Sequence, residues 1–200
     1  MGWRSTLTYQ QVAALGITRS LVVLAHYGDV DQMEVRLAAD RALADNPEAL
    51  AAAGERGHEA IVRLLLKYEP HLAARVAVVG KTRALTALLF VNGMNPNFRG
   101  WLGVTPLHRF ARQGEIESAA IFLDHGADLD ARDEEFCTTP VGYAALAGKL
   151  QMVEFLLQRG AKVRMPDAPA WASPIALATY RGHNEIACLL SSYDDASSAM

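Results

Sequence analysis

The chain has 200 residues, of which 51% are hydrophobic and 20% are charged, enough apolar material to bury a continuous core. Its formal net charge of -3 excludes the basic excess that is typical of nucleic-acid binding proteins. Its two cysteines are too few for a disulfide framework, and neither a membrane-spanning apolar run nor a signal-peptide pattern is present. We therefore expect a cytoplasmic protein that binds neither membranes nor nucleic acid.

The N-terminal segment is predicted to close one end of the molecule. Residues 6–16 have the pattern of a short amphipathic helix, so we assign residues 1–18 to a capping helix. Gly2 and Thr6 also match the N-myristoylation pattern, which requires a free glycine after removal of the initiator methionine. The match is too short to predict a lipid anchor.

Residues 19–104 are predicted to form helix pairs, because each of three glycines is followed by an apolar run. Gly28, Gly57 and Gly80 precede these runs and stand 29 and 23 residues apart. Such steps leave little room for long connections. Two alternatives remain open at this point, a degenerate repeat array or an all-helical cap.

The C-terminal half contains a regular repeat. Gly114, Gly148 and Gly182 stand 34 residues apart, and each follows a hydroxyl-proline pair by nine residues. We predict about six units, at residues 19–47, 48–70, 71–104, 105–138, 139–172 and 173–191, in a repeat domain spanning 19–191, followed by a disordered tail at 192–200.

Each part of the repeat has a physical reason. The threonine or serine can cap a helix, and proline is tolerated in the first helical turn. The glycine ends that helix because it adopts positive φ at little cost. An amphipathic second helix follows, as in residues 152–157. The sequence therefore predicts an all-α solenoid of helix-turn-helix units, none of which buries its apolar face alone.

These residues resemble the ankyrin repeat. The similarity is strongest in Thr105-Pro106-Leu107-His108, in Gly182-His183 and in residues 125–131, and it extends over about residues 19–191. The resemblance implies a stack of helix pairs with short β-hairpin-like fingers along one side of a concave groove. We expect complete fingers mainly in the C-terminal half, at about Gly93–Val104, Gly126–Thr138 and Gly160–Ala172.

No pattern of catalytic or metal-ligating residues is present in the sequence. No two histidines have the i, i+4 spacing of a helical metal site, and the resemblance gives His58, His108 and His183 structural positions. Cys137 and Cys188 have no histidine partner nearby in sequence, so we interpret both as incidental or buried thiols. The acidic run 133–135 is interpreted as solvated. We predict a protein that is not an enzyme and needs no cofactor or metal.

The resemblance also implies a binding surface, formed by the finger tips and the exposed positions of the first helices. It is rich in aromatic residues and arginine, the residue types that dominate binding hot spots. The predicted partner-binding residues are Trp101, Leu102, Val104, Arg109, Arg112, Gln113, Glu135, Phe136, Tyr143, Leu146, Tyr180 and Arg181. We expect Arg109, Tyr143 and Tyr180 at the surface. For Trp101, Phe136 and Trp171, packing between fingers is the alternative.

These observations predict a module that binds another protein and is itself monomeric. Two alternatives remain. The chain could be the targeting or regulatory part of a larger enzyme, or it could be a self-associating scaffold.

Overall fold

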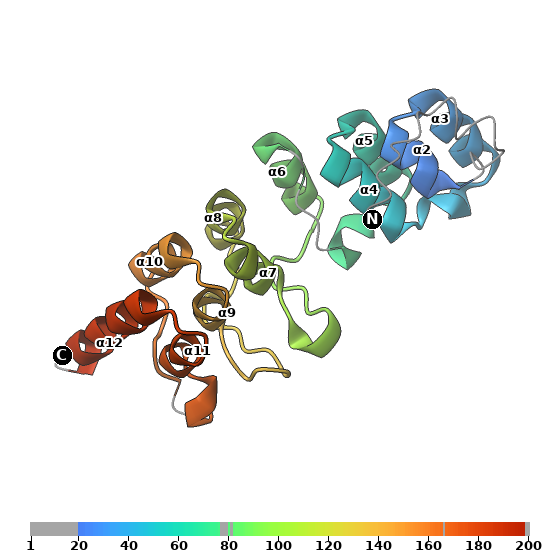
Figure 1. Cartoon of the computed structure of the whole chain (residues 1–200). Coiled ribbons are helices and arrows are strands. Elements are labelled where there is room, and N and C mark those ends of the chain that lie inside the picture. The colour runs from blue at the N-terminus through green and yellow to red at the C-terminus, as the bar shows by residue number, and fades with distance from the viewer. Residues whose placement is uncertain (1–19, 77–79, 81, 166, 199–200) are drawn as a thin grey trace, which may run out of the picture. The chain divides into compact units, whose positions relative to one another are not determined.

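The computed structural model describes residues 20–76, 80, 82–165 and 167–198, and within them the secondary structure is entirely helical, with no β-strand (Figure 1). The chain divides into two compact parts, Met1–Asn95 and Pro96–Met200, which are called here the N-terminal part and the C-terminal part. The predicted capping helix at 1–18 and Gly2 lie outside the described residues. None of the helices described is long and apolar enough to cross a membrane.

The N-terminal part consists of short helices. They are α2 (Leu21–Tyr27), α3 (Val30–Ala39), the 3-10 helix η1 (Arg41–Ala44), α4 (Pro47–Arg56), α5 (Glu59–Tyr68), the 3-10 helix η2 (Leu72–Arg75) and α6 (Arg83–Val91). The helices α2 and α3 form one pair and α4 and α5 form the next, with α2 against α4 and α3 against α5. Only η1 stands between the two pairs, so no full finger separates the first two repeats.

The third repeat departs from the predicted pattern at its start. Its opening segment contains only the single 3-10 turn η2, whereas α6 forms the expected second helix. Gly80 keeps the position of the turn glycine but lies outside the positive-φ region. It is needed for another reason, because a Cβ there would lie 2.8 Å from the backbone nitrogen of Thr86. The Thr86 hydroxyl donates a hydrogen bond to the Gly80 carbonyl at 3.2 Å, which fixes this close approach.

The C-terminal part contains three regular helix pairs. In chain order its elements are the 3-10 helix η3 (Trp101–Gly103), α7 (Pro106–Gln113), α8 (Ile116–Asp124), α9 (Pro140–Leu146), α10 (Leu150–Gln158), the 3-10 helix η4 (Ala170–Ala172), α11 (Pro174–Tyr180) and α12 (Asn184–Ser198). The first helices α7, α9 and α11 lie side by side in one row, and each packs on its own second helix (Figure 1). This arrangement confirms the predicted stack of helix-turn-helix units.

The predicted helix boundaries follow the proline and glycine positions. Each first helix of the C-terminal part begins at the proline of a hydroxyl-proline pair. Gly114, Gly148 and Gly182 have φ values of 82°, 68° and 75°, the left-handed conformation that ends the first helix at little cost. The core is formed by apolar side chains of both helices, including the fully buried Leu107 and Phe122.

The fingers are turns with single 3-10 helices at η3 and η4 rather than β-hairpins, and a repeated hydrogen bond joins them. The side-chain oxygen of Asn97 accepts from the Asp128 backbone N–H at 2.6 Å. Asp130, one repeat later, accepts in the same way from the Lys162 backbone N–H at 3.0 Å. Successive fingers are therefore held in register by equivalent side chains.

The end of the chain was predicted to be disordered from residue 192, whereas α12 continues to Ser198. Arg164 on the preceding finger supplies one reason, because its Nε donates to the Asp194 carboxylate at 2.6 Å. Asp194 is nearly buried in this contact.

Candidate partner-binding surface

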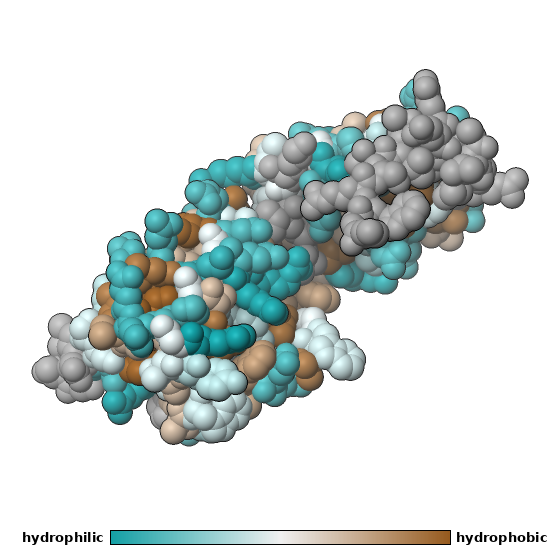
Figure 2. Space-filling view, in the orientation of Figure 1, coloured by the Kyte–Doolittle hydropathy of each residue, from teal (hydrophilic) through white to brown (hydrophobic). Residues whose placement is uncertain are grey.

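Most of the predicted binding residues lie at the surface of the C-terminal part. Trp101 and Tyr180 are 85% and 82% exposed, although both are large and partly apolar. The other exposed members are Arg109, Arg112, Gln113, Glu135 and Arg181, and the half-buried members are Leu102, Val104, Phe136 and Leu146. Trp171, for which packing between fingers was an alternative, is 57% exposed. In the view of Figure 2, hydrophobic and hydrophilic residues are intermixed over this part of the chain.

Three of these residues share one register position along the row of first helices. Arg112 on α7, Leu146 on α9 and Tyr180 on α11 are spaced by the 34-residue repeat. Because α7 packs against α9 and α9 against α11, the three positions follow one another across neighbouring helices. We call these residues, together with Trp101 and Arg109, the groove surface.

Tyr143 is a correction to the prediction, because it is buried rather than at the surface. Only 4% of the residue is exposed, and its hydroxyl donates to Asp133 Oδ2 at 3.2 Å. Burial, followed by the neighbouring carboxylate, raises the pKa of Tyr143 well above its ordinary value. The sequence held a signal that was missed. The residue one repeat later is Leu177, which is also buried, although Arg109, one repeat earlier, is exposed.

Asp133 was interpreted as solvated, but it organises the central finger. It is 4% exposed, and its carboxylate accepts hydrogen bonds from the backbone N–H groups of Glu135 (2.9 Å), Phe136 (2.7 Å) and Thr138 (2.9 Å). With the Tyr143 hydroxyl, four donors therefore converge on one carboxylate. This arrangement links the finger tip to the first helix beneath it, and so fixes where Glu135 and Phe136 lie.

His108 links α7 to the same finger. Its Nδ1 accepts the backbone N–H of Thr105 at 3.2 Å, so the proton of the neutral ring is on Nε2, which donates to the Thr138 carbonyl at 3.4 Å. The Thr105 hydroxyl lies 2.8 Å from Nδ1 and completes a capping box. Burial lowers the pKa of His108 below its ordinary value, which keeps the ring neutral. We call this connection the histidine bridge.

The next repeat lacks the bridge. Gly142 stands where His108 stands one repeat earlier, and a Cβ there would lie 2.0 Å from Thr138 Oγ1. The Thr139 hydroxyl, at the N-cap of α9, makes no capping hydrogen bond, and the buried Oγ1 atoms of Thr138 and Thr139 have no hydrogen-bond partner in the structure. The hydrogen bonds of this motif are therefore formed around Thr105 and absent around Thr139.

A matched pair of substitutions should separate these two threonines. Replacing Thr105 with valine should lower the free energy of unfolding by about 1–2 kcal/mol, because it removes a cap and a partner of His108. Replacing Thr139 with valine should change it by less than about 0.5 kcal/mol, or raise it, because no hydrogen bond is lost. Chemical denaturation of both variants measures the difference. Equal losses of unfolding free energy would contradict the finding that the Thr139 hydroxyl makes no hydrogen bond.

The remaining histidines and cysteines do not form a reactive cluster. No group of three or more histidine, cysteine, aspartate or glutamate side chains in the described part of the chain is placed to hold a metal ion. His58 lies against Gly28, and its Nε2 is 3.1 Å from the His26 carbonyl oxygen. His183 packs on Gly148 in the same way. Each of these two rings therefore packs against the turn glycine of the preceding repeat. Cys188 is exposed rather than buried.

Comparison with known proteins agrees with this geometry. The family model for ankyrin repeats (3 copies) matches residues 70–167. The chain is 30% identical over 168 residues to cyclin-dependent kinase inhibitor 2A of Monodelphis domestica, which covers 82% of this chain and 95% of that protein. It is 33% identical over 115 residues to cyclin-dependent kinase 4 inhibitor B of Bos taurus, which covers 57% of this chain and 85% of that protein.

A longer relative matches over only part of its length. The chain is 29% identical over 170 residues, or 83% of its own length, to the human Arf-GAP with coiled-coil, ANK repeat and PH domain-containing protein 2. It spans 20% of the length of that protein.

Repeated helix pairs form a buried frame, and this frame presents different side chains on one surface. This architecture defines the class of helical repeat proteins whose surface serves for interaction. The chain belongs to the ankyrin repeat family. Ankyrin repeats are protein-interaction modules, and the family is not a catalytic one.

Proposed function

We propose that this chain binds a partner protein through the groove surface of its C-terminal part, without catalysing a reaction. The observation that carries the proposal is the exposure of Trp101 and Tyr180, each above 80%, together with the exposure of Arg109 and Arg112. Large aromatic side chains and arginine are the residue types whose removal most weakens protein complexes. Leaving two such aromatics in water gives the isolated chain no packing energy, which supports a role in contact.

The finger tip contributes in a second way. Because Asp133 and the histidine bridge hold the central finger, Glu135 and Phe136 are presented by a fixed backbone. A partner then meets a preorganised surface and loses less conformational entropy on binding.

The relatives suggest the first partner to test. Two of them are named as inhibitors of cyclin-dependent kinases, and one of these is matched over 95% of its length. A cyclin-dependent kinase is therefore the partner class that we would assay first. The Arf-GAP relative, of which the chain spans 20%, favours a second candidate function, as the interaction part of a larger protein.

The test uses a triple variant, W101A/R109A/Y180A, in the full chain. We expect it to weaken partner binding by roughly 30-fold or more, since hot-spot truncations cost about 2 kcal/mol or more. The partner is first captured from lysate of the source organism, or supplied as a purified cyclin-dependent kinase. The affinity is then measured by titration calorimetry.

The matched control is E117A/Q151A/E154A, which removes exposed side chains of the second helices α8 and α10. Both triple variants should melt like the wild type, because all six side chains are exposed. Unchanged affinity in the groove variant, or an equal loss in the control, would disprove the assignment of this surface. A stable dimer in light scattering without any partner would favour the self-associating scaffold instead.

A further inference from the structure

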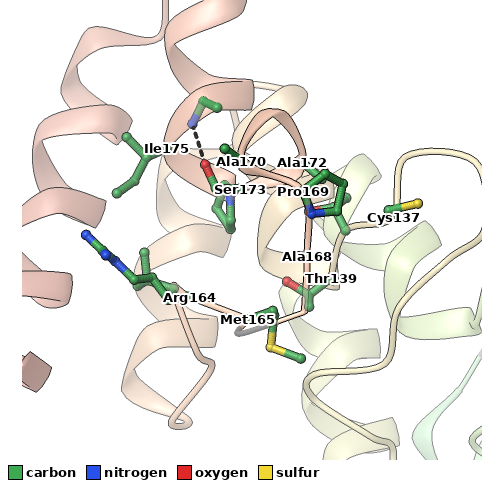
Figure 3. Close-up of a pocket in the computed structure, with 14 residues that line it drawn as sticks. Cys137, Thr139, Arg164, Met165, Ala168, Pro169, Ala170, Ala172, Ser173 and Ile175 are labelled. Carbon is green, nitrogen blue, oxygen red and sulfur yellow. Dashed lines mark hydrogen bonds between the residues drawn. The ribbon is translucent and has the colours of Figure 1, made fainter.

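A pocket of about 600 Å³ lies in the C-terminal part, between the finger that ends at Thr139 and the finger that follows α10. Figure 3 shows the side chains around it. Its lining is mostly apolar and includes Cys137, Thr139, Met165, Pro169, Ala172 and Ile175. Most of these residues are half-buried, so the pocket is open to the surface. We call it the inter-finger pocket.

The pocket is lined by the two residues that a histidine bridge would join in this repeat. One repeat earlier, His108 fills the space between Thr105 and Thr138, and its ring reaches across to the next finger. The residues equivalent to Thr105 and Thr138 are Thr139 and Ala172, and both line the pocket. Gly142 has no side chain that could span them, and the Thr138 side chain already occupies the space beside it.

Unpaired hydroxyl groups distinguish this pocket from an ordinary apolar hollow. At the equivalent N-cap positions, Thr82 and Ser173 each accept a backbone N–H, at 3.2 Å and 3.1 Å. The Thr139 hydroxyl has no partner, although only 1% of this residue is exposed. A buried hydroxyl without a hydrogen bond is unfavourable, and rotation about the Cα–Cβ bond can redirect it toward a new partner. An occupant with a polar atom would supply that partner.

The charge of the lining indicates a neutral occupant. Arg164 is the charged residue that lines the pocket, and its guanidinium group is already paired with Asp194. The remaining lining offers apolar contact and hydroxyl groups. It therefore fits a side chain that has a large apolar body and one hydrogen-bonding group.

We propose that the inter-finger pocket binds a tyrosine or tryptophan side chain of the partner protein, whose polar atom pairs with the Thr139 hydroxyl. These two side chains combine a large apolar surface with a single polar group, as the lining requires. The volume lies within the range of pockets that enclose a small ligand and accommodates either ring system. The inference rests on the proposed function, because it specifies the chemistry of the same partner.

The experiment uses N-acetyl-L-tyrosinamide as the probe and N-acetyl-L-phenylalaninamide, which lacks only the hydroxyl, as its match. Both are titrated into the full chain and followed by backbone amide NMR. We expect both to shift resonances of residues 137–139 and 163–176. The tyrosine derivative should bind about two- to tenfold more tightly, the contribution of one net hydrogen bond.

Two variants complete the test. Thr139→Val should abolish the preference for the tyrosine derivative while leaving the phenylalanine derivative unaffected. Thr179→Val, which alters an exposed threonine of α11 outside the lining, should preserve the preference. As a second measurement in a Cys188→Ser background, a saturating concentration of the tyrosine derivative should slow alkylation of Cys137 at least threefold.

The proposal is overturned if neither derivative shifts these resonances, if the two bind equally, or if Thr139→Val keeps the preference. Such a result leaves the proposed function untouched when W101A/R109A/Y180A still weakens partner binding as expected. If W101A/R109A/Y180A still binds the partner like the wild type and Thr139→Val keeps the preference for the tyrosine derivative, both proposals are contradicted. Thr139→Val should also weaken the binding of an identified partner protein about two- to tenfold, and this measurement connects the two experiments.

Discussion

Replacing Asp133 with alanine should lower the free energy of unfolding by about 3–4 kcal/mol, the loss expected when a buried hydrogen-bond network is broken. The carboxylate accepts from three backbone N–H groups of one finger and from the Tyr143 hydroxyl. Alanine leaves all four donors without their acceptor. Urea denaturation followed by circular dichroism measures the change.

The neighbouring Glu134 provides the control, because its side chain is exposed while its backbone belongs to the same finger. Glu134→Ala should change the free energy of unfolding by less than about 0.5 kcal/mol. The loss of unfolding free energy in Asp133→Asn should lie between those of Asp133→Ala and Glu134→Ala, since the amide keeps one acceptor oxygen but turns an N–H group toward the donors. A loss below about 1 kcal/mol for Asp133→Ala would show that water replaces the carboxylate and that the finger does not depend on it.

The second large effect is expected at His108. His108→Ala should cost about 3 kcal/mol, because it removes the capping interaction with Thr105, the bond to the Thr138 carbonyl and the volume of a buried ring. The ring also packs edge-on against Tyr143, with 5.0 Å between the centroids. The same denaturation experiment measures the loss.

The pH dependence of stability provides an independent test at this residue. Because burial lowers the pKa of His108 in the folded state, the unfolded chain binds the proton more readily. The stabilisation is therefore complete above the unfolded-state value of 6.5 and is lost as the pH falls below it. Wild-type protein should be less stable at pH 5 than at pH 7.5.

His26 contributes in the same direction, since its pKa is lowered by burial and by the neighbouring Arg56 and His58. The decisive quantity is therefore the difference between variants. The drop in stability from pH 7.5 to pH 5 should be smaller in His108→Gln than in the wild type. Equal drops would mean that folding does not lower the pKa of His108 and that its buried, neutral state is wrongly assigned.

The sequence predicted the helical frame where the signal was a repeated physical requirement. The turn glycines 114, 148 and 182 and the prolines eight residues before them set the first helices of the C-terminal part. The third repeat lacks this signal, because its sequence has no hydroxyl-proline pair, and its opening segment forms only η2. Its glycine was correctly placed in register, but it serves close packing rather than a turn.

The candidate site was less predictable, because exposure depends on contacts that are distant along the chain. Tyr143 resembles a surface aromatic until Asp133, ten residues earlier, is brought against its hydroxyl. Asp133 itself reads as one of three solvated acidic residues, and only the folded finger directs three N–H groups at it. The inter-finger pocket is lined by Thr139 and Ala172, the residues equivalent to Thr105 and Thr138, and this equivalence shows only when two neighbouring repeats are compared.

The absent bridge at Gly142 also bears on how the array opens. In a solenoid each repeat is stabilised chiefly by its neighbours, so the weakest interface determines where cooperativity breaks. The α9 repeat has no histidine that reaches the finger before α11, so this interface lacks one connection that the interface before it has. The last helix pair would then exchange with partly opened states while the repeats before it stay folded. A partner side chain seated between the two fingers would couple them, and recognition would extend the cooperative unit to the end of the chain.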